Sequence, residues 1–195
     1  EELCRQVFHL VHQIQQRTNP QDRVILCTQP GLDFIVGFYA CIATGTVAVP
    51  LFPPLTNMMA NRFLHIINNV DAQLILFDKR TSRALHIDQK INQFVPHLLK
   101  PFLNLPNIPE HLFNKLEHMR HNTLFIDSAH KINPPSETVH SCTEHDVAFI
   151  QYTSGSTADP KGVLVTHENL IDNSNIIQKM CQNSEESISY SWLPP

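Results

Sequence analysis

The sequence has 195 residues, of which 42% are hydrophobic and 16% are charged. This balance is ordinary for a globular protein, and the length suffices for one hydrophobic core or two small ones. The formal net charge is −4, which argues against the strongly basic surface of a nucleic-acid-binding protein.

The first part of the chain predicts two strands joined by a buried helix. Apolar residues at helical spacing predict a helix over residues 2–17, which ends at Asn19-Pro20. The segments that follow predict a strand over 23–28, a buried helix over 32–44 and a buried strand over 46–51. A strand, a helix and a strand in this order are typical of a parallel pair.

The uncharged stretch 34–55 has a second interpretation, because it is long enough for a membrane-spanning helix. However, Gly45-Thr46 interrupts it, and Pro50, Pro53 and Pro54 lie at its end. These breaks favour a buried helix followed by a buried strand. No integral membrane segment is therefore expected.

The rest of the chain continues to alternate between helices and strands. Helices are predicted over residues 57–69, 83–95, 110–121 and 167–181, and strands over 73–77, 124–126 and 187–193. A proline-rich connection follows residue 95, and a polar linker covers residues 127–145. This pattern predicts an α/β fold with mainly parallel sheets and helices on both faces.

A hydroxyl-rich loop, Tyr152–Gly162, lies between two short apolar runs that predict buried strands, 147–150 and 163–165. Four hydroxyl groups, two glycines and one lysine are concentrated in this loop, namely Thr153, Ser154, Gly155, Ser156, Thr157, Lys161 and Gly162. Hydroxyls donate hydrogen bonds, and glycines with positive φ let backbone N–H groups approach a ligand. With the charge of the lysine, these groups suit a polyphosphate.

Two common phosphate-binding motifs do not fit this loop. A Walker motif requires a glycine directly before the lysine, whereas Gly162 follows Lys161. The Gly-x-Gly-x-x-Gly pattern of protein kinases is absent as well. A simple polar hairpin remains an alternative, since Asp159-Pro160 and Lys161-Gly162 are plausible turns.

The segments Tyr152–Gly162 and Thr166–Leu170 resemble the phosphate-binding signature of the adenylate-forming (AMP-binding) superfamily. Ala158 stands where that superfamily usually has glycine, which bears on the path of the loop. Three further stretches, together with Gln151, are similar to one branch, the fatty acyl-AMP ligases; the stretches are Pro30–Ile35, Ala48–Pro54 and Ser191–Pro195. Long-chain acyl-CoA synthetases share some of them.

The resemblance implies an enzyme that uses ATP to convert a fatty acid into its acyl-adenylate and releases pyrophosphate. It implies that Thr153, Ser154, Gly155, Ser156, Thr157, Lys161 and Gly162 bind the phosphates of ATP with Mg²⁺, and that Lys161 is catalytic. The acyl group would pass to an acyl carrier protein or, as the alternative, to coenzyme A.

The resemblance also implies that residues 1–195 are the amino-terminal portion of the adenylation domain. The small carboxy-terminal domain and the ligands of adenine, ribose and Mg²⁺ would lie beyond residue 195. We therefore expect this chain alone to be inactive. The five cysteines show no Cys-x-x-Cys spacing, which favours reduced thiols in a cytoplasmic protein.

Three alternatives remain open. Two histidines and a cysteine within 140–145, with His118 and His121, could form a metal-binding module, although a second ligand pair at matched spacing is missing. A non-catalytic nucleotide-binding domain would keep the loop without the chemistry. An amino-acid-activating domain of a peptide synthetase would change the substrate, but residues 30–54 and 192–195 favour a fatty acid.

Overall fold

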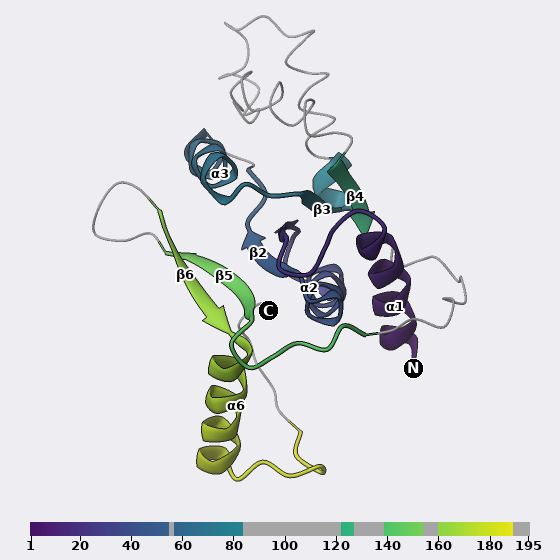
Figure 1. Cartoon of the computed structure of the whole chain (residues 1–195), viewed down its shortest axis with the longest axis vertical. Coiled ribbons are helices and arrows are strands. Elements are labelled where there is room, and N and C mark those ends of the chain that lie inside the picture. Colours follow the sequence, from purple (N-terminus) through teal and green to yellow (C-terminus); the bar gives the residue numbers. More distant parts are fainter. Residues whose placement is uncertain (55–56, 84–121, 127–138, 154–159, 189–195) are drawn as a thin grey trace, which may run out of the picture.

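The computed structural model describes residues 1–54, 57–83, 122–126, 139–153 and 160–188. In chain order, its helices and strands are α1 (Glu2–Gln15), β1 (Arg23–Cys27), α2 (Leu32–Thr44), β2 (Val47–Leu51), α3 (Asn57–Val70), β3 (Leu74–Asp78), β4 (Thr123–Ile126), β5 (Val147–Thr153), β6 (Lys161–Thr166) and α6 (His167–Cys181). Figure 1 shows helices on both faces of the sheet and the hairpin of β5 and β6 at one side.

The strands form one six-stranded sheet in the order β4-β3-β1-β2-β5-β6. All neighbours pair in parallel except β5 and β6, which are antiparallel. The predicted strand–helix–strand unit is confirmed, because β1 pairs in parallel with β2 from Arg23↔Val47 to Cys27↔Leu51. The α/β class and the mainly parallel sheet follow the sequence prediction.

Two apolar clusters cover the two faces of the sheet. Helices α1 and α2 pack on one face, against Val24 and Leu26 of β1. Helix α3 packs on the other, against Ile25 and Cys27. This alternation follows from the two-residue period of a strand, and both faces are apolar because helices cover both. Each fully buried Leu, Ile or Val side chain contributes about 1.5–3 kcal/mol relative to an exposed one.

Helix α2 is the buried helix predicted over residues 32–44. It ends where Gly45 adopts a left-handed conformation with φ of 70°, which glycine accommodates without steric cost. Its inner face contains Gly37, Ala40 and Cys41, so that the helix lies close to the sheet. No helix in the described residues is both long and apolar enough to cross a membrane.

The structure changes some expectations. Strand β6 is not buried: Lys161 to Leu164 are exposed, and β5 is only partly buried. Ser187 and Ile188 do not form a strand, and residues 189–195 lie outside the described part. The helix predicted over 83–95 lies outside it except for Arg83, which is helical. The helix predicted over 110–121 and most of the linker, 127–138, also lie outside it. Helix α6 has the predicted bounds, but no residue of it is buried.

Candidate functional site

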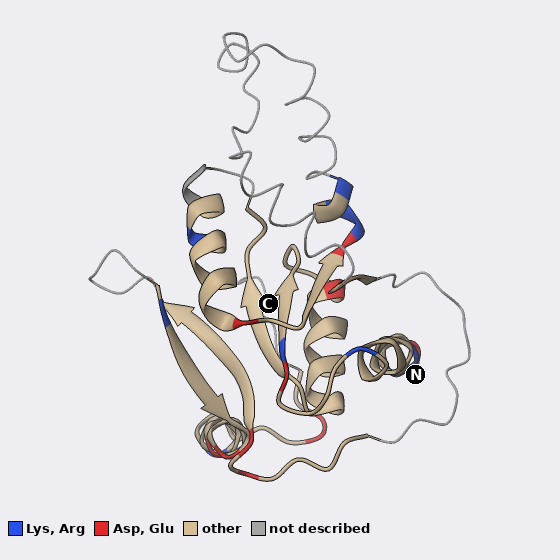
Figure 2. Cartoon of the chain, turned by 45° about the horizontal axis from the view of Figure 1, so that its top comes forward, with Lys and Arg blue, Asp and Glu red and all other residues tan. Residues whose placement is uncertain are grey.

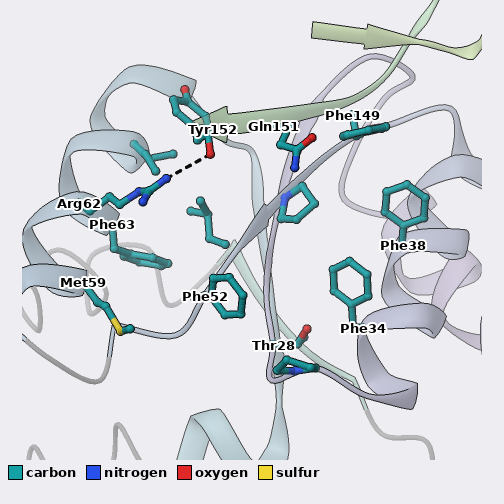
Figure 3. A pocket seen from close by; sticks show the side chains of 14 residues that line it. Thr28, Phe34, Phe38, Phe52, Met59, Arg62, Phe63, Phe149, Gln151 and Tyr152 are labelled. Atoms are coloured by element: carbon teal, nitrogen blue, oxygen red, sulfur yellow. Dashed lines mark hydrogen bonds between the residues drawn. The ribbon is translucent and has the colours of Figure 1, made fainter. Parts of the chain in front are cut away.

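A cavity of about 540 Å³ lies where β1, β2 and β5 end, at their carboxyl ends. Ligands of open α/β sheets bind outside this edge, and binding cavities of 300–1,000 Å³ are usual. The residues around it come from the strands β2 and β5, from the helices α2 and α3, and from the segments that follow β1 and β2 (Figure 3). They are Thr28, Pro30, Phe34, Phe38, Pro50, Leu51, Phe52, Met59, Arg62, Phe63, Ile66, Phe149, Gln151 and Tyr152.

The cavity coincides with an early end to strand pairing. Five residue pairs join β1 to β2, but only Ala48↔Phe149 joins β2 to β5. Two residues after Ala48 comes Pro50, which has no N–H to donate to a neighbouring strand. The two strands therefore separate toward their carboxyl ends, where Pro50, Leu51, Gln151 and Tyr152 line the cavity.

Six of the fourteen described residues that line the cavity are aromatic. On α2, the rings of Phe34 and Phe38 lie 6.1 Å apart, and Phe38 meets Phe149 of β5 edge to face at 5.7 Å. From the opposite side, α3 contributes the fully buried Phe63. Such rings suit an apolar ligand. No Asp or Glu is among the described residues that line the cavity.

Arg62 is the cation of the cavity wall, and it joins α3 to β5. Its Nη2 donates a hydrogen bond of 3.1 Å to the backbone oxygen of Tyr152 (dashed line in Figure 3). Burial raises the pKa of the Tyr152 phenol, so this hydroxyl stays protonated at neutral pH and can donate a hydrogen bond. Arg62 thus brings a positive charge to the point where β5 leads into the hydroxyl-rich loop.

The predicted phosphate-binding residues lie only partly within the described chain. Thr153 ends β5, Lys161 begins β6, and the two are paired across the hairpin. Both are exposed, and Figure 2 shows the blue of Lys and Arg residues at the loop-side end of β6. Ser154, Gly155, Ser156, Thr157 and Ala158 lie outside the described residues. The structure therefore places the two ends of the loop, next to the cavity.

The structural role of Gly162 differs from the one predicted from the sequence. It lies in β6 opposite Tyr152, and its φ is not positive. A Cβ atom there would come within 2.9 Å of Ile150 Cγ2 and 3.2 Å of Tyr152 Cζ. The glycine therefore makes room for the tyrosine ring rather than supplying an unusual backbone conformation.

The helix after the hairpin begins as predicted. The Thr166 hydroxyl accepts a 3.2 Å hydrogen bond from the Asn169 N–H, and the Asn169 side chain accepts one of 3.1 Å from the Thr166 N–H. This capping box fixes the start of α6. Glu168 lies in the first turn, where a negative charge is favourable.

The described residues contain no group of three or more His, Cys, Asp or Glu side chains placed to hold a metal ion. His140, Cys142 and His145 therefore do not form such a centre. His118 and His121 lie outside the described part of the chain. Nothing in the described cavity is suited to hold Mg²⁺ by protein ligands alone, because carboxylates are the usual protein ligands of this ion.

A comparison with family models gives a match over residues 1–195 to the family described as AMP-binding enzyme. The chain belongs to this family. This match confirms the resemblance to the AMP-binding superfamily that the loop and Thr166–Leu170 predicted.

Two relatives are similar over most of the chain. The medium-chain fatty acid–acyl-carrier-protein ligase TtuA of Teredinibacter turnerae is 30% identical over 191 residues, which cover 89% of this chain and 29% of that protein. The long-chain fatty acid–AMP ligase FadD32 of Mycolicibacterium smegmatis is 31% identical over 185 residues, covering 93% and 25%. The chain thus spans less than a third of the length of these relatives.

Solved structures agree with the fold. A fatty acyl-adenylate ligase from L. pneumophila, in complex with acyl adenylate and pyrophosphate, superimposes with a TM-score of 0.67 at 30% identity. The match covers all of this chain and 29% of that one. McyG A-PCP, complexed with phenylalanyl-adenylate, gives a TM-score of 0.72 at 22% identity, a level that supports the fold alone.

The sequence did not single out the cavity residues as a site. Thr28, Arg62 and the aromatic rings come from five separate segments, and no local motif connects them. One signal was present: polar or bulky residues directly after parallel strands, such as Thr28 after β1 and Phe52 after β2, point to the ligand-binding edge.

Proposed function

We propose that the polypeptide containing this chain activates a fatty acid with ATP, forming the acyl-adenylate and releasing pyrophosphate. One observation carries the proposal: strand β5 lines an aromatic cavity that has Arg62 but no carboxylate in its wall, and the same strand leads into the hydroxyl-rich loop. The names of the relatives, a fatty acid–acyl-carrier-protein ligase and a fatty acid–AMP ligase, support the same chemistry.

In this proposal the acyl chain occupies the cavity between α2 and α3. Its carboxylate lies at the end formed by Gln151 and Tyr152, close to the loop. Arg62 offsets the negative charge of the carboxylate, since it lines the same cavity and its bond to Tyr152 uses only one of its five N–H donors. Aromatic rings exclude water around the chain, and the carboxylate faces the nucleotide.

The triphosphate of ATP lies along the loop. It accepts hydrogen bonds from the loop residues Thr153, Ser154, Gly155, Ser156 and Thr157. Gly162 keeps the neighbouring strand in place, and Lys161 stabilises the departing pyrophosphate. A lysine about 4 Å from a phosphate charge contributes about 4 kcal/mol at an effective dielectric constant near 20. Mg²⁺ would supply further charge neutralisation, with ligands beyond the described residues.

The acceptor we favour is an acyl carrier protein, because relatives bear that activity in their names. Coenzyme A is the alternative. We further propose that residues 1–195 are the amino-terminal portion of the adenylation domain and are inactive alone. The five free cysteines are compatible with catalysis in a reducing cytoplasm.

The test is acid-dependent exchange of labelled pyrophosphate into ATP by the full polypeptide. We expect exchange with medium- or long-chain fatty acids and none with amino acids. Mass spectrometry then follows the acyl group to a phosphopantetheinylated carrier protein or to coenzyme A, which separates the two acceptors. Absence of exchange with every acid would refute the proposed function.

A further inference from the structure

Among the described residues that line the cavity, Thr28 has a buried hydroxyl group without a hydrogen-bond partner. Thr28 follows β1, lines the cavity, and is 4% exposed. Its Oγ1 atom has no hydrogen-bond partner within the described part of the chain. A buried hydroxyl left unpaired costs about 1–3 kcal/mol, so proteins keep such groups rarely.

The position of Thr28 is fixed by the neighbouring strand. The buried Asp78, at the end of β3, accepts a 2.6 Å hydrogen bond from the Gln29 N–H. The same carboxylate accepts bonds from the N–H and hydroxyl of Thr81. The backbone next to Thr28 is thus tied to the end of β3, and such support from neighbouring groups is how a binding group is usually preorganised.

Thr28 lies at the far end of the cavity from the loop. Strand β2 separates β1 from β5 in the sheet, so the end of β1 lies two strand spacings, about 10 Å, from the end of β5. Figure 3 shows Gln151 and Tyr152 at one end of the view and Thr28 at the other, beyond the rings of Phe34 and Phe52. A chain whose carboxylate lies beside Gln151 therefore extends toward Thr28.

We propose that Thr28 determines specificity for acids that carry a hydroxyl group on the distal part of the chain. This inference rests on the proposed function. The threonine hydroxyl both donates and accepts hydrogen bonds. A rotation of about 120° about χ1 carries the hydroxyl into the place of the methyl group, from which it can meet a substrate hydroxyl.

The unpaired hydroxyl of Thr28 allows the cavity to discriminate between acids with and without a hydroxyl group. A site with a buried polar group favours a substrate that pairs with it and disfavours the analogue that leaves it unpaired. A wholly apolar cavity would show the opposite preference, because the hydroxyl of the substrate would lose its water without gaining a partner. The ratio of kcat/KM for a hydroxy acid to that for its plain counterpart therefore reports on Thr28.

The experiment compares matched pairs, such as octanoic with 8-hydroxyoctanoic acid and decanoic with 10-hydroxydecanoic acid, in pyrophosphate exchange by the full polypeptide. We expect a hydroxy acid to be preferred at one chain length. We expect Thr28→Val to lower that preference about tenfold, and Thr28→Ser to retain it. An equal ratio in wild type and Thr28→Val would overturn the proposal.

Thermal unfolding gives a second measurement that needs no turnover. Without acid, Thr28→Val should melt at the same temperature as wild type or higher, because it removes an unpaired buried hydroxyl. The preferred hydroxy acid should then raise the melting temperature of wild type more than that of the variant. Equal shifts would contradict the role of Thr28, whereas missing exchange with every acid would contradict only the proposed function.

Discussion

Lys161 and Thr153 face each other across the last pair of the β5–β6 hairpin, and both are exposed. This position lets a single lysine reach a phosphate held by the loop. We expect Lys161→Ala to lower the rate of pyrophosphate exchange at least tenfold while changing the KM for the acid little, because charge develops on the leaving group. Lys161→Arg should recover part of the rate.

A matched control for this substitution is Lys179→Ala, which removes an exposed lysine at the far end of α6. Its exchange rate should equal that of wild type. If Lys161→Ala also keeps the wild-type rate, Lys161 has no part in the chemistry.

Gly162 shows that a glycine can be required for space. Because its Cβ would collide with Ile150 and Tyr152, we expect Gly162→Ala to cost about 1–3 kcal/mol in stability. Displacement of Tyr152 should also raise the KM for ATP. Urea unfolding and exchange kinetics measure both effects, with Val163→Ala, at an exposed neighbour, as the control. Unchanged stability would show that the ring moves aside freely.

At the scale of elements, α2 depends on close approach to the sheet. A Cβ at Gly37 would lie 2.5 Å from Leu26 Cδ1 and 2.9 Å from Ile126 Cδ1. We expect Gly37→Ala to destabilise the protein by about 1–3 kcal/mol despite the better helix propensity of alanine. Chemical denaturation tests this, and Ala43→Gly at a partly buried position of the same helix shows the cost of propensity alone.

The end of α2 is equally specific. Gly45 has a positive φ, and a Cβ there would collide with the ring of His140. The backbone N–H of His140 donates a 2.8 Å hydrogen bond to the Ala43 oxygen, which fastens the segment before β5 to this helix end. The segment predicted as a polar linker is thus partly anchored.

Most elements could be predicted because their signals are local. The bounds of α2 and α6 follow from Gly45 and from the Thr166 cap, which act within a few residues. The order of the strands could not be predicted, since β3 passes to the far side of β1. The exposure of β6 was missed because an apolar run of three residues does not reveal whether a helix covers it.

The candidate site likewise has one part that the sequence could predict and one part that it could not. The loop residues form a contiguous motif in the sequence, and the structure places Thr153 and Lys161, predicted within the loop, in the paired strand ends on either side of it. The cavity arises from contacts between distant segments, such as Arg62 with Tyr152, that are 90 residues apart. Only the sheet brings them together, so no spacing rule could have named them.

At the scale of the whole molecule, the buried thiols of Cys27 and Cys41 make stability depend on pH. Burial raises the pKa of Cys41 from 9.0 to about 12 and also raises that of Cys27. In the unfolded state these thiols ionise near pH 9, so above it the unfolded state binds fewer protons than the folded state. Stability is therefore full below pH 9 and falls as the pH rises toward 12.

We expect each thiol to reduce the free energy of unfolding by about 1.4 kcal/mol per pH unit in that window. Urea unfolding at pH 8, 9 and 10 measures the slope. Cys41→Ala should make it shallower, whereas Cys4→Ala, at an exposed thiol, should leave it unchanged. Parallel slopes for all three proteins would contradict the assignment.

Strand β5 belongs both to the cavity wall and to the hairpin. Arg62 connects the carbonyl of Tyr152, near the end of this strand, to α3. An acid that settles between the helices thus constrains the segment that the nucleotide must organise, and a nucleotide does the same for the acid. By thermodynamic reciprocity, each should tighten the affinity for the other by the same factor. The two substrates are then expected to bind cooperatively rather than independently.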